Sequence, residues 1–222
     1  MHPGEMGNDL RVMKEIKGVS LQVKPEPFIE LDRQFRQLDP KEDPEKAALD
    51  SYTASLLGRE SGLSWKDLLE HRLVVVLGEP GSGKTEEFRE RAKTLQAEGE
   101  AAFFVHLDRL ITHPLSEILP PYDYEKFKVW LRGDDRATFF LDSVDEAKYQ
   151  STGAFIATLD RFRNAISGNG LMRMCLLLSS RISEWRPQGD ASQLMARFPI
   201  PPPPRSKRQT PDANHSEGTV EE

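Results

Sequence analysis

Apolar residues gather in four short runs along the chain, and between these runs they recur at helical spacing. The runs lie at 73–77, 101–107, 137–141 and 172–178. Nearly continuous apolar runs of this length are typical of strands that are buried on both faces, as in a parallel sheet. Amphipathic helical patterns occupy 86–97 and 153–166. This alternation predicts an α/β fold in which helices cover both faces of a mainly parallel sheet.

Prolines and charges divide the chain into three parts. Residues 1–48 are predicted to be a charged, proline-containing N-terminal arm, and residues 199–222 a disordered, proline-rich and polar tail. Neither end carries the apolar periodicity that a core needs, so flexible termini are expected. Residues 49–198 hold the four runs and are predicted to form the folded domain. Within it, Ser64 followed by Asp67 predicts a capped helix at 64–69.

The composition narrows the class of protein. The chain has 222 residues and a net charge of −6, which argues against a broadly electropositive nucleic-acid surface. No apolar stretch approaches the ~18 residues of a membrane-spanning helix. The one cysteine, Cys175, lies in an apolar run and is predicted to be a buried, inert thiol. Together with a start that lacks a basic and apolar leader, these features predict a cytoplasmic protein that does not contact membranes.

A phosphate-binding pattern follows the first apolar run. It reads G-x-x-x-x-G-K-T, and its residues are Gly78, Glu79, Pro80, Gly81, Ser82, Gly83, Lys84 and Thr85. Between a strand and a helix, this pattern predicts a loop whose backbone N–H groups surround nucleotide phosphates. Lys84 is expected to reach the β- and γ-phosphates, and the Thr85 hydroxyl to bind Mg²⁺. The predicted ligand is a nucleoside triphosphate, with ATP and Mg²⁺ as the expected cofactors.

Acidic residues follow the third apolar run. Asp142 is predicted to act on Mg²⁺ through coordinated water, opposite Thr85. Asp145 and Glu146 come three and four residues later, and one of them, with Glu146 favoured, is predicted to orient and polarise the attacking water. The alternative is structural: Asp142 would cap a helix, and the other two acids would be favourable charges in its first turn.

Polar residues also end the fourth apolar run, as Ser179, Ser180 and Arg181. Their side chains are expected at the same sheet edge as the acids, because the carboxyl ends of parallel strands meet there. A hydroxyl or the Arg181 guanidinium could sense the γ-phosphate, since arginine presents fixed donors to anionic oxygens. A plain salt bridge from Arg181 to Asp145 or Glu146 is the competing interpretation.

Taken together, these segments resemble the NACHT branch of the STAND P-loop ATPases. The resemblance rests on GEPGSGKT at 78–85, FFLDSVDEA at 139–147 and LLLSSRISEW at 176–185, and it covers residues 64–198. It implies a three-layer P-loop NTPase core, with Asp142 for Mg²⁺, Asp145 and Glu146 for hydrolysis and Arg181 for sensing. Members of this family are nucleotide-operated switches in defence or signalling. ATP binding, or exchange for ADP, releases an autoinhibited monomer into an oligomer.

The sequence departs from this family in its number of strands. The family's sheet has the ASCE-type order 5-1-4-3-2, whereas four strands are counted here, and neither the fifth strand nor a helical lid is recognised. The chain is therefore expected to be a truncated or fragmentary member, or half of a split system, whose first strand has an unpaired edge. Self-association, or a partner chain that supplies the lid, would follow. Two hypotheses lead: a slow Mg²⁺-dependent ATPase, and a non-catalytic interaction fragment of a larger NACHT system. A third, an AAA-type remodelling ATPase, is disfavoured because neither a lid nor an arginine-finger segment is recognised.

Overall fold

The computed structural model describes residues 33–39, 41–56, 62–166 and 168–198. Most of the predicted arm and the whole of the predicted tail lie outside these residues, so the domain boundaries stay predictions. In chain order the elements are α1 (Pro44–Leu56), α2 (Trp65–Glu70), β1 (Leu73–Leu77), α3 (Lys84–Ala97), β2 (Ala101–His106), the short 3-10 helix η1 (Asp108–Ile111), α4 (Leu115–Ile118), α5 (Pro121–Arg132), β3 (Ala137–Asp142), α6 (Val144–Gln150), α7 (Thr152–Ile166), α8 (Gly170–Arg173), β4 (Met174–Ser180) and α9 (Pro187–Arg197).

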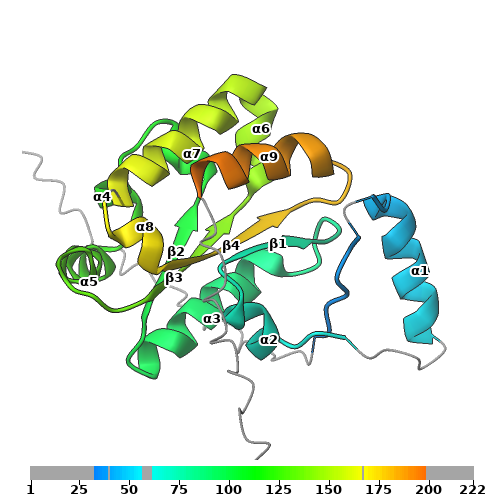
Figure 1. Cartoon of the computed structure of the whole chain (residues 1–222), viewed down its shortest axis with the longest axis horizontal. Helices are drawn as coiled ribbons and strands as arrows, with labels where there is room; N and C mark the ends of the chain where they lie inside the picture. The colour runs from blue at the N-terminus through cyan, green and yellow to red at the C-terminus, as the bar shows by residue number, and fades with distance from the viewer. Residues whose placement is uncertain (1–32, 40, 57–61, 167, 199–222) are drawn as a thin grey trace, which may run out of the picture. The chain divides into compact units, whose positions relative to one another are not determined.

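The four strands form one parallel sheet in the order β1-β4-β3-β2 (Figure 1). Strands that follow one another in sequence are joined through helices, as parallel pairing requires. The predicted α/β class and the mainly parallel sheet are confirmed. The order matches positions 1-4-3-2 of the expected sheet. Within the described part of the chain, no strand pairs with the outer edge of β1.

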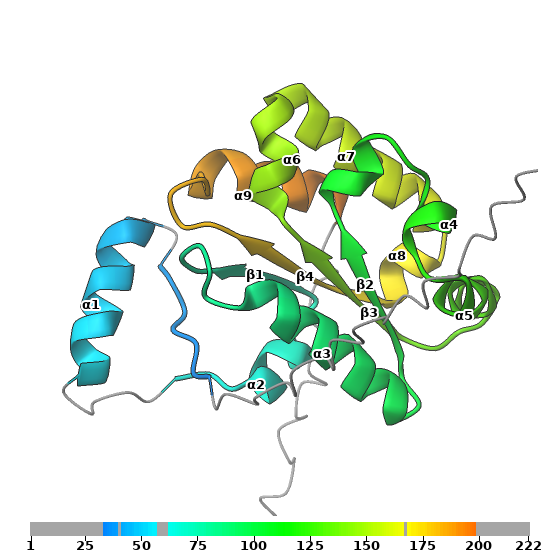
Figure 2. The ribbon, with the colours of Figure 1, turned by 180° about the vertical axis from the view of Figure 1, so that it is seen from behind.

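Side chains that alternate along the strands supply two separate apolar clusters, one on each face of the sheet. On β3, Phe139 and Leu141 join the cluster that contains α7, α9 and α5, whereas Phe140 joins the cluster that contains α2 and α3. The two views of the ribbon show α6, α7 and α9 on one side of the sheet and α2 and α3 on the other (Figures 1 and 2). The result is a helix–sheet–helix sandwich, because each face of a buried parallel sheet needs its own cover.

Several local expectations are confirmed and others are corrected. The capped helix is present: the Asp67 carboxylate accepts from the Ser64 backbone N–H at 2.7 Å, and the Ser64 hydroxyl accepts from the Asp67 N–H at 3.4 Å. Cys175 is buried. The fourth strand starts at Met174, not at 172, because 170–173 form the short helix α8 and Met172 is 48% exposed. Helix α9 was not predicted, and helix α6 was expected only under the structural alternative for the three acids. Among the described residues, no helix is long and apolar enough to cross a membrane.

Candidate nucleotide-binding site

The predicted motifs come together at the carboxyl edge of the sheet. The phosphate loop leaves β1, Asp142 ends β3, and Arg181 follows β4, which lies between those two strands. The loop joins this edge directly, because the N–H of Gly78 donates to the carbonyl of Ser180 at 3.2 Å. Parallel strands bring their carboxyl ends to one side, and ligands of open α/β sheets bind there. Motifs separated by more than fifty residues in sequence thus form one site.

The phosphate loop has the backbone conformation that its glycines allow. Gly81 and Gly83 have φ angles of +73° and +85°, values that side-chain-bearing residues rarely adopt. A Cβ on Gly78 would lie 3.2 Å from the Ser82 hydroxyl oxygen and 3.3 Å from Lys84 Cδ, so the loop closes tightly on itself. The 14-residue helix α3 begins at Lys84, directly behind the loop, and no side chain caps it at Gly83. Its exposed N–H groups and positive dipole suit an anion.

Lys84 spans the loop from within. Its ammonium donates to the carbonyls of Gly78 at 2.8 Å and Glu79 at 2.9 Å, and to the Ser82 hydroxyl at 3.2 Å. Burial lowers the pKa of this lysine below its ordinary value, and the nearby carboxylates of Asp145 and Asp142 oppose that shift. The ammonium therefore lies against the loop that is expected to hold phosphate.

Asp142 is the most fully bonded group of the site. Its side chain is 2% exposed, and three hydroxyls donate to it: Thr85 at 2.8 Å, Ser143 at 3.1 Å and Ser179 at 2.5 Å. His106 Nδ1 lies 3.8 Å from the same carboxylate. The Ser179 hydroxyl also accepts from the Ser143 N–H at 3.1 Å. The contact with Thr85 joins the two groups that were predicted to serve Mg²⁺.

These residues fit a magnesium ion bound together with phosphate. Mg²⁺ keeps several waters and takes only one or two protein ligands, a hydroxyl and a carboxylate in nucleotide sites. Thr85 and Asp142 are such a pair. In the described part of the chain, no group of three or more His, Cys, Asp or Glu side chains could hold a metal alone. The donor set therefore suits an ion that nucleotide phosphates help to bind.

Ser143 holds an uncommon backbone conformation between Asp142 and helix α6. Its φ is 65°, the left-handed region, and among the described residues no other non-glycine has a positive φ. Such a conformation costs free energy and is found most often at functional sites. Here it lets the chain turn at the end of β3, so that Ser143 contacts Asp142 and α6 begins at once. The sequence reasoning did not single out Ser143.

The other two acids differ from each other. Asp145 is 5% exposed, and its carboxylate forms an ion pair with Arg181 Nε at 2.8 Å. Glu146 is exposed, and within the described residues it takes part in no hydrogen bond or ion pair. Both lie in the first turn of α6, as the structural alternative expected, although the residue before that helix is Ser143 and not Asp142. The salt bridge that was one interpretation of Arg181 is present, and it selects Asp145.

Negative charge accumulates around Glu146. Partial burial and the carboxylates of Asp108, Asp145 and Asp142 raise the pKa of Glu146 above its ordinary value. Asp108 comes just after β2, at the same edge of the sheet, and was not predicted as part of the site. Its position after an apolar run is the signal that could have found it, since the same rule identified Asp142.

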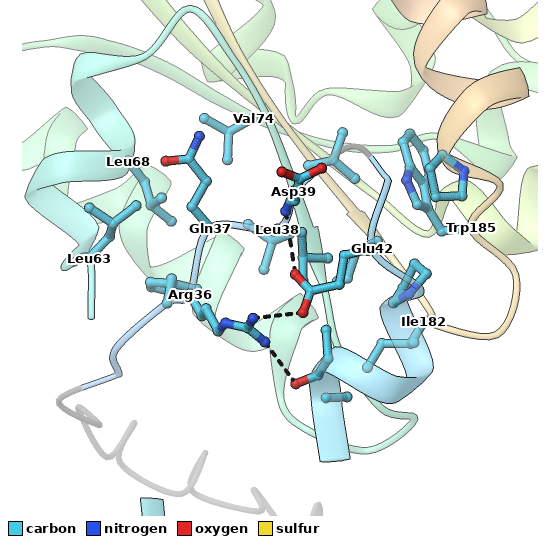
Figure 3. Close-up of a pocket in the computed structure, with 18 of the residues that line it drawn as sticks. Arg36, Gln37, Leu38, Asp39, Glu42, Leu63, Leu68, Val74, Ile182 and Trp185 are labelled. Atoms are coloured by element: carbon cyan, nitrogen blue, oxygen red, sulfur yellow. Dashed lines mark hydrogen bonds and ion pairs between the residues drawn. The ribbon is translucent and has the colours of Figure 1, made fainter. Parts of the chain in front are cut away.

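A pocket of about 650 Å³ borders the site along the outer edge of β1. All five residues of β1 line it, together with the segment 34–39, the start of α1 and the residues Ile182 and Trp185 after β4 (Figure 3). Arg36 crosses one wall, where it donates to Glu42 at 2.7 Å and to the Ala47 carbonyl at 3.3 Å. The pocket reaches Leu77, the last residue before the phosphate loop.

Comparisons with known proteins add little beyond the fold. No protein-family profile and no curated protein matches the chain. Among solved structures, it is similar to a DNA replication initiation factor, with 15% identity, a TM-score of 0.38 and coverage of 73% of this chain and 50% of that one. It is also similar to PCH-2 of C. elegans, with 16% identity, a TM-score of 0.36 and coverage of 75% and 43%. The chain thus spans half or less of these structures, and at such scores neither assigns it a function.

The class of protein follows from the sheet and the site of this chain. A parallel β1-β4-β3-β2 sheet carries a glycine-rich loop between β1 and α3, and the hydroxyl of the loop threonine meets the aspartate that ends β3. This is the core of a P-loop NTPase.

Proposed function

We propose that this chain binds a Mg²⁺-nucleoside triphosphate, with ATP the expected nucleotide, and hydrolyses it slowly as the switch module of a NACHT-type STAND protein. The observation that carries the proposal is the 2.8 Å contact between the Thr85 hydroxyl and Asp142. These groups come from segments 57 residues apart and are the two that nucleotide-bound Mg²⁺ would need.

In the proposed complex, each part of the site has a separate task. The loop from Gly78 to Gly83 surrounds the phosphates with backbone N–H groups, and Lys84 leaves its carbonyl partners to neutralise phosphate oxygens. Thr85 and Asp142 would hold Mg²⁺, which when bound offsets negative charge on the phosphates. Because Ser143 and Ser179 also hold Asp142, its carboxylate is oriented before any ligand arrives.

For hydrolysis, Glu146 is the acid that is available to a water molecule. Asp145 is buried and paired with Arg181, whereas Glu146 has no such partner within the described residues. A carboxylate that accepts a hydrogen bond from water orients it for attack and draws on its proton. The raised pKa of Glu146 makes it a stronger proton acceptor than an ordinary glutamate.

The ion pair between Arg181 and Asp145 supports a switch role. Arg181 Nε is 2.8 Å from Asp145 Oδ2, and its side chain is 34% exposed, so the guanidinium is held at the site and still partly accessible. We infer that the guanidinium exchanges this carboxylate for the γ-phosphate when ATP is bound. Asp145 would then lose its partner, and the contact that ties helix α6 to Arg181 would be broken.

The test of nucleotide binding is calorimetry with the Lys84→Ala variant. Wild type should release heat with Mg-ATP, and Lys84→Ala should bind it at least about tenfold more weakly, because one charge-assisted contact contributes ~1.5–3 kcal/mol. The matched control is Lys93→Ala, on the same helix, whose exposed ammonium pairs with Glu90 at 2.5 Å. Equal affinities for wild type and Lys84→Ala would reject the phosphate-loop assignment.

A second candidate function is a non-catalytic interaction fragment that acts through a partner chain or a second copy of itself. The observation in its favour is the outer edge of β1, which no described strand covers and which borders the pocket. Unpaired strand edges are templates for pairing with another chain. Steady turnover of ATP by the isolated chain would exclude this candidate, whereas an inactive chain that associates would favour it.

A further inference from the structure

Arg33, which lies far from the motif in sequence, contacts the phosphate loop. Its Nη2 donates to the backbone carbonyl of Ser82, and its Nε forms an ion pair with Glu87 of helix α3. The Glu87 side chain is only 4% exposed, and its carboxylate also accepts from the indole N–H of Trp65 at 2.6 Å. A buried carboxylate that is paired with a cation and accepts a hydrogen bond is a firm anchor, because a charge away from water must be paired. Arg33 therefore joins this anchor to the loop.

The backbone next to Arg33 is fixed as well. Phe35 and Leu63 exchange two backbone hydrogen bonds, at 2.8 Å and 2.7 Å. The Phe35 ring packs edge-on against Trp65 with its centroid 4.9 Å away. The guanidinium is thus delivered to the loop by a short paired segment and not by a freely rotating chain.

The geometry of a peptide group explains what the contact with Ser82 does. A trans peptide is planar, so the carbonyl of Ser82 and the N–H of Gly83 point in opposite directions. When Arg33 holds the carbonyl on its own side, the N–H of Gly83 is held on the other side. Gly83 lies between the loop and the first turn of α3, with a φ of +85°. This conformation would otherwise be one of several open to a glycine.

Gly83 also leaves the space that Arg33 needs. A Cβ on Gly83 would lie 3.2 Å from Arg33 Nη2, closer than an ordinary contact. The guanidinium therefore lies directly against the loop backbone at the residue before Lys84.

We propose that Arg33 is a positioning residue for the phosphate loop: it fixes the Ser82–Gly83 peptide so that the Gly83 N–H faces the phosphates. This inference rests on the proposed nucleotide binding and adds a residue 49 positions before Ser82 to that site. Preorganised donors bind an anion more tightly than mobile ones, because less conformational freedom is lost on binding.

A simpler role for Arg33 would be to neutralise the buried charge of Glu87. The two roles differ in what the variant Glu87→Gln should do. Glutamine keeps an acceptor for Trp65 and removes the charge, so it removes the need for a neutralising cation. If Arg33 only neutralises Glu87, the double variant Arg33→Ala/Glu87→Gln should behave like wild type in every assay.

The experiment measures thermal stability and the affinity for Mg-ATP and for Mg-tripolyphosphate, which has no base or ribose. We expect Arg33→Ala to weaken both ligands by about tenfold, which corresponds to ~1.4 kcal/mol. The double variant should regain the thermal stability that Arg33→Ala loses and should still bind both ligands weakly. The control is Arg36→Ala, because Arg36 lies on the same segment as Arg33 but contacts Glu42 and the Ala47 carbonyl. This variant should bind both ligands like wild type.

Three outcomes would overturn the proposal. Unchanged affinity of Arg33→Ala would show that the loop does not need this contact. Full recovery of affinity in the double variant would mean that Arg33 acts only through Glu87. Weaker binding of Mg-ATP alone, with normal binding of Mg-tripolyphosphate, would assign Arg33 to the nucleoside. Failure of the wild type to bind either ligand would instead reject the proposed function, and the inference with it.

Discussion

The two edges of β1 differ in how many of their backbone N–H and C=O groups pair with another strand. On the inner edge, β1 pairs with β4 over its whole length, and the pairing continues into the loop through Gly78 and Ser180. On the outer edge no described strand is paired, and a pocket follows the strand instead. The inner edge leads to preorganised groups that suit chemistry, whereas the outer edge leaves backbone groups that suit association. The two edges of one short strand thus offer different kinds of surface.

At the inner edge, the substitution Glu146→Gln is expected to have the largest effect on activity. The substitution keeps the size of the side chain and removes the acceptor charge, so hydrolysis should fall by ~10²–10⁴ while ATP binding is preserved. Single-turnover release of phosphate measures the hydrolysis rate, and calorimetry measures the affinity for ATP. Glu125→Gln is the control, because Glu125 is exposed on α5 and pairs with Lys128, away from the site. Normal turnover by Glu146→Gln would remove Glu146 from the hydrolytic role.

A smaller effect is expected at the outer edge, from Ala48→Arg. Ala48 lines the pocket from α1, so a long cation there should fill the space beside β1 without touching the phosphate loop. If the chain associates through this edge, its affinity for a second copy, measured by sedimentation, should fall by about tenfold, because the long side chain obstructs the approach of a partner strand. Asp50→Arg, on the same helix but outside the pocket lining, should leave association unchanged. A simultaneous loss of ATP affinity in Ala48→Arg would mean that the two edges are not separate.

The smallest effect is expected from Ser64→Ala, at the start of α2, whose Leu68 lines the pocket. Loss of this cap should cost ~1 kcal/mol of the free energy of unfolding. For a domain of this size, the melting temperature should fall by about 2–4 °C. Scanning calorimetry at neutral pH measures the change, and an unchanged melting temperature would contradict the capping role.

The same cap predicts a dependence on pH. Hydrogen bonds from the Ser64 hydroxyl and backbone N–H hold the pKa of Asp67 below its usual value of 3.8. Since the pKa is lower in the folded state, this contribution is fully present above the unfolded pKa and is lost as the pH falls through the folded one. The difference in melting temperature between wild type and Ser64→Ala should therefore shrink in acid. If the difference in melting temperature grows in acid instead, the pKa of Asp67 is not lowered by this cap.

Much of the fold was predictable because its signals are local. Each strand is a short apolar run, and the phosphate loop is one continuous pattern with glycines at Gly81 and Gly83, where the structure has positive φ. The boundaries were less certain: α8 replaced the start of the fourth strand, because Met172 is exposed in spite of its apolar character. Helix α9 was not predicted, because its sequence PQGDASQLMAR carries few apolar residues at helical spacing.

The sequence alone was enough to predict the strand–helix alternation, the glycine-rich loop and the acids at strand ends, because each depends on neighbours along the chain. The folded structure was needed to show which partner each polar group takes. Arg181 pairs with Asp145, whereas Glu146 is unpaired among the described residues. Asp142 accepts from hydroxyls of three segments, and Arg33 contacts the carbonyl of Ser82. Those partners are set by strand register and packing between segments that are distant in sequence, and no local pattern encodes them.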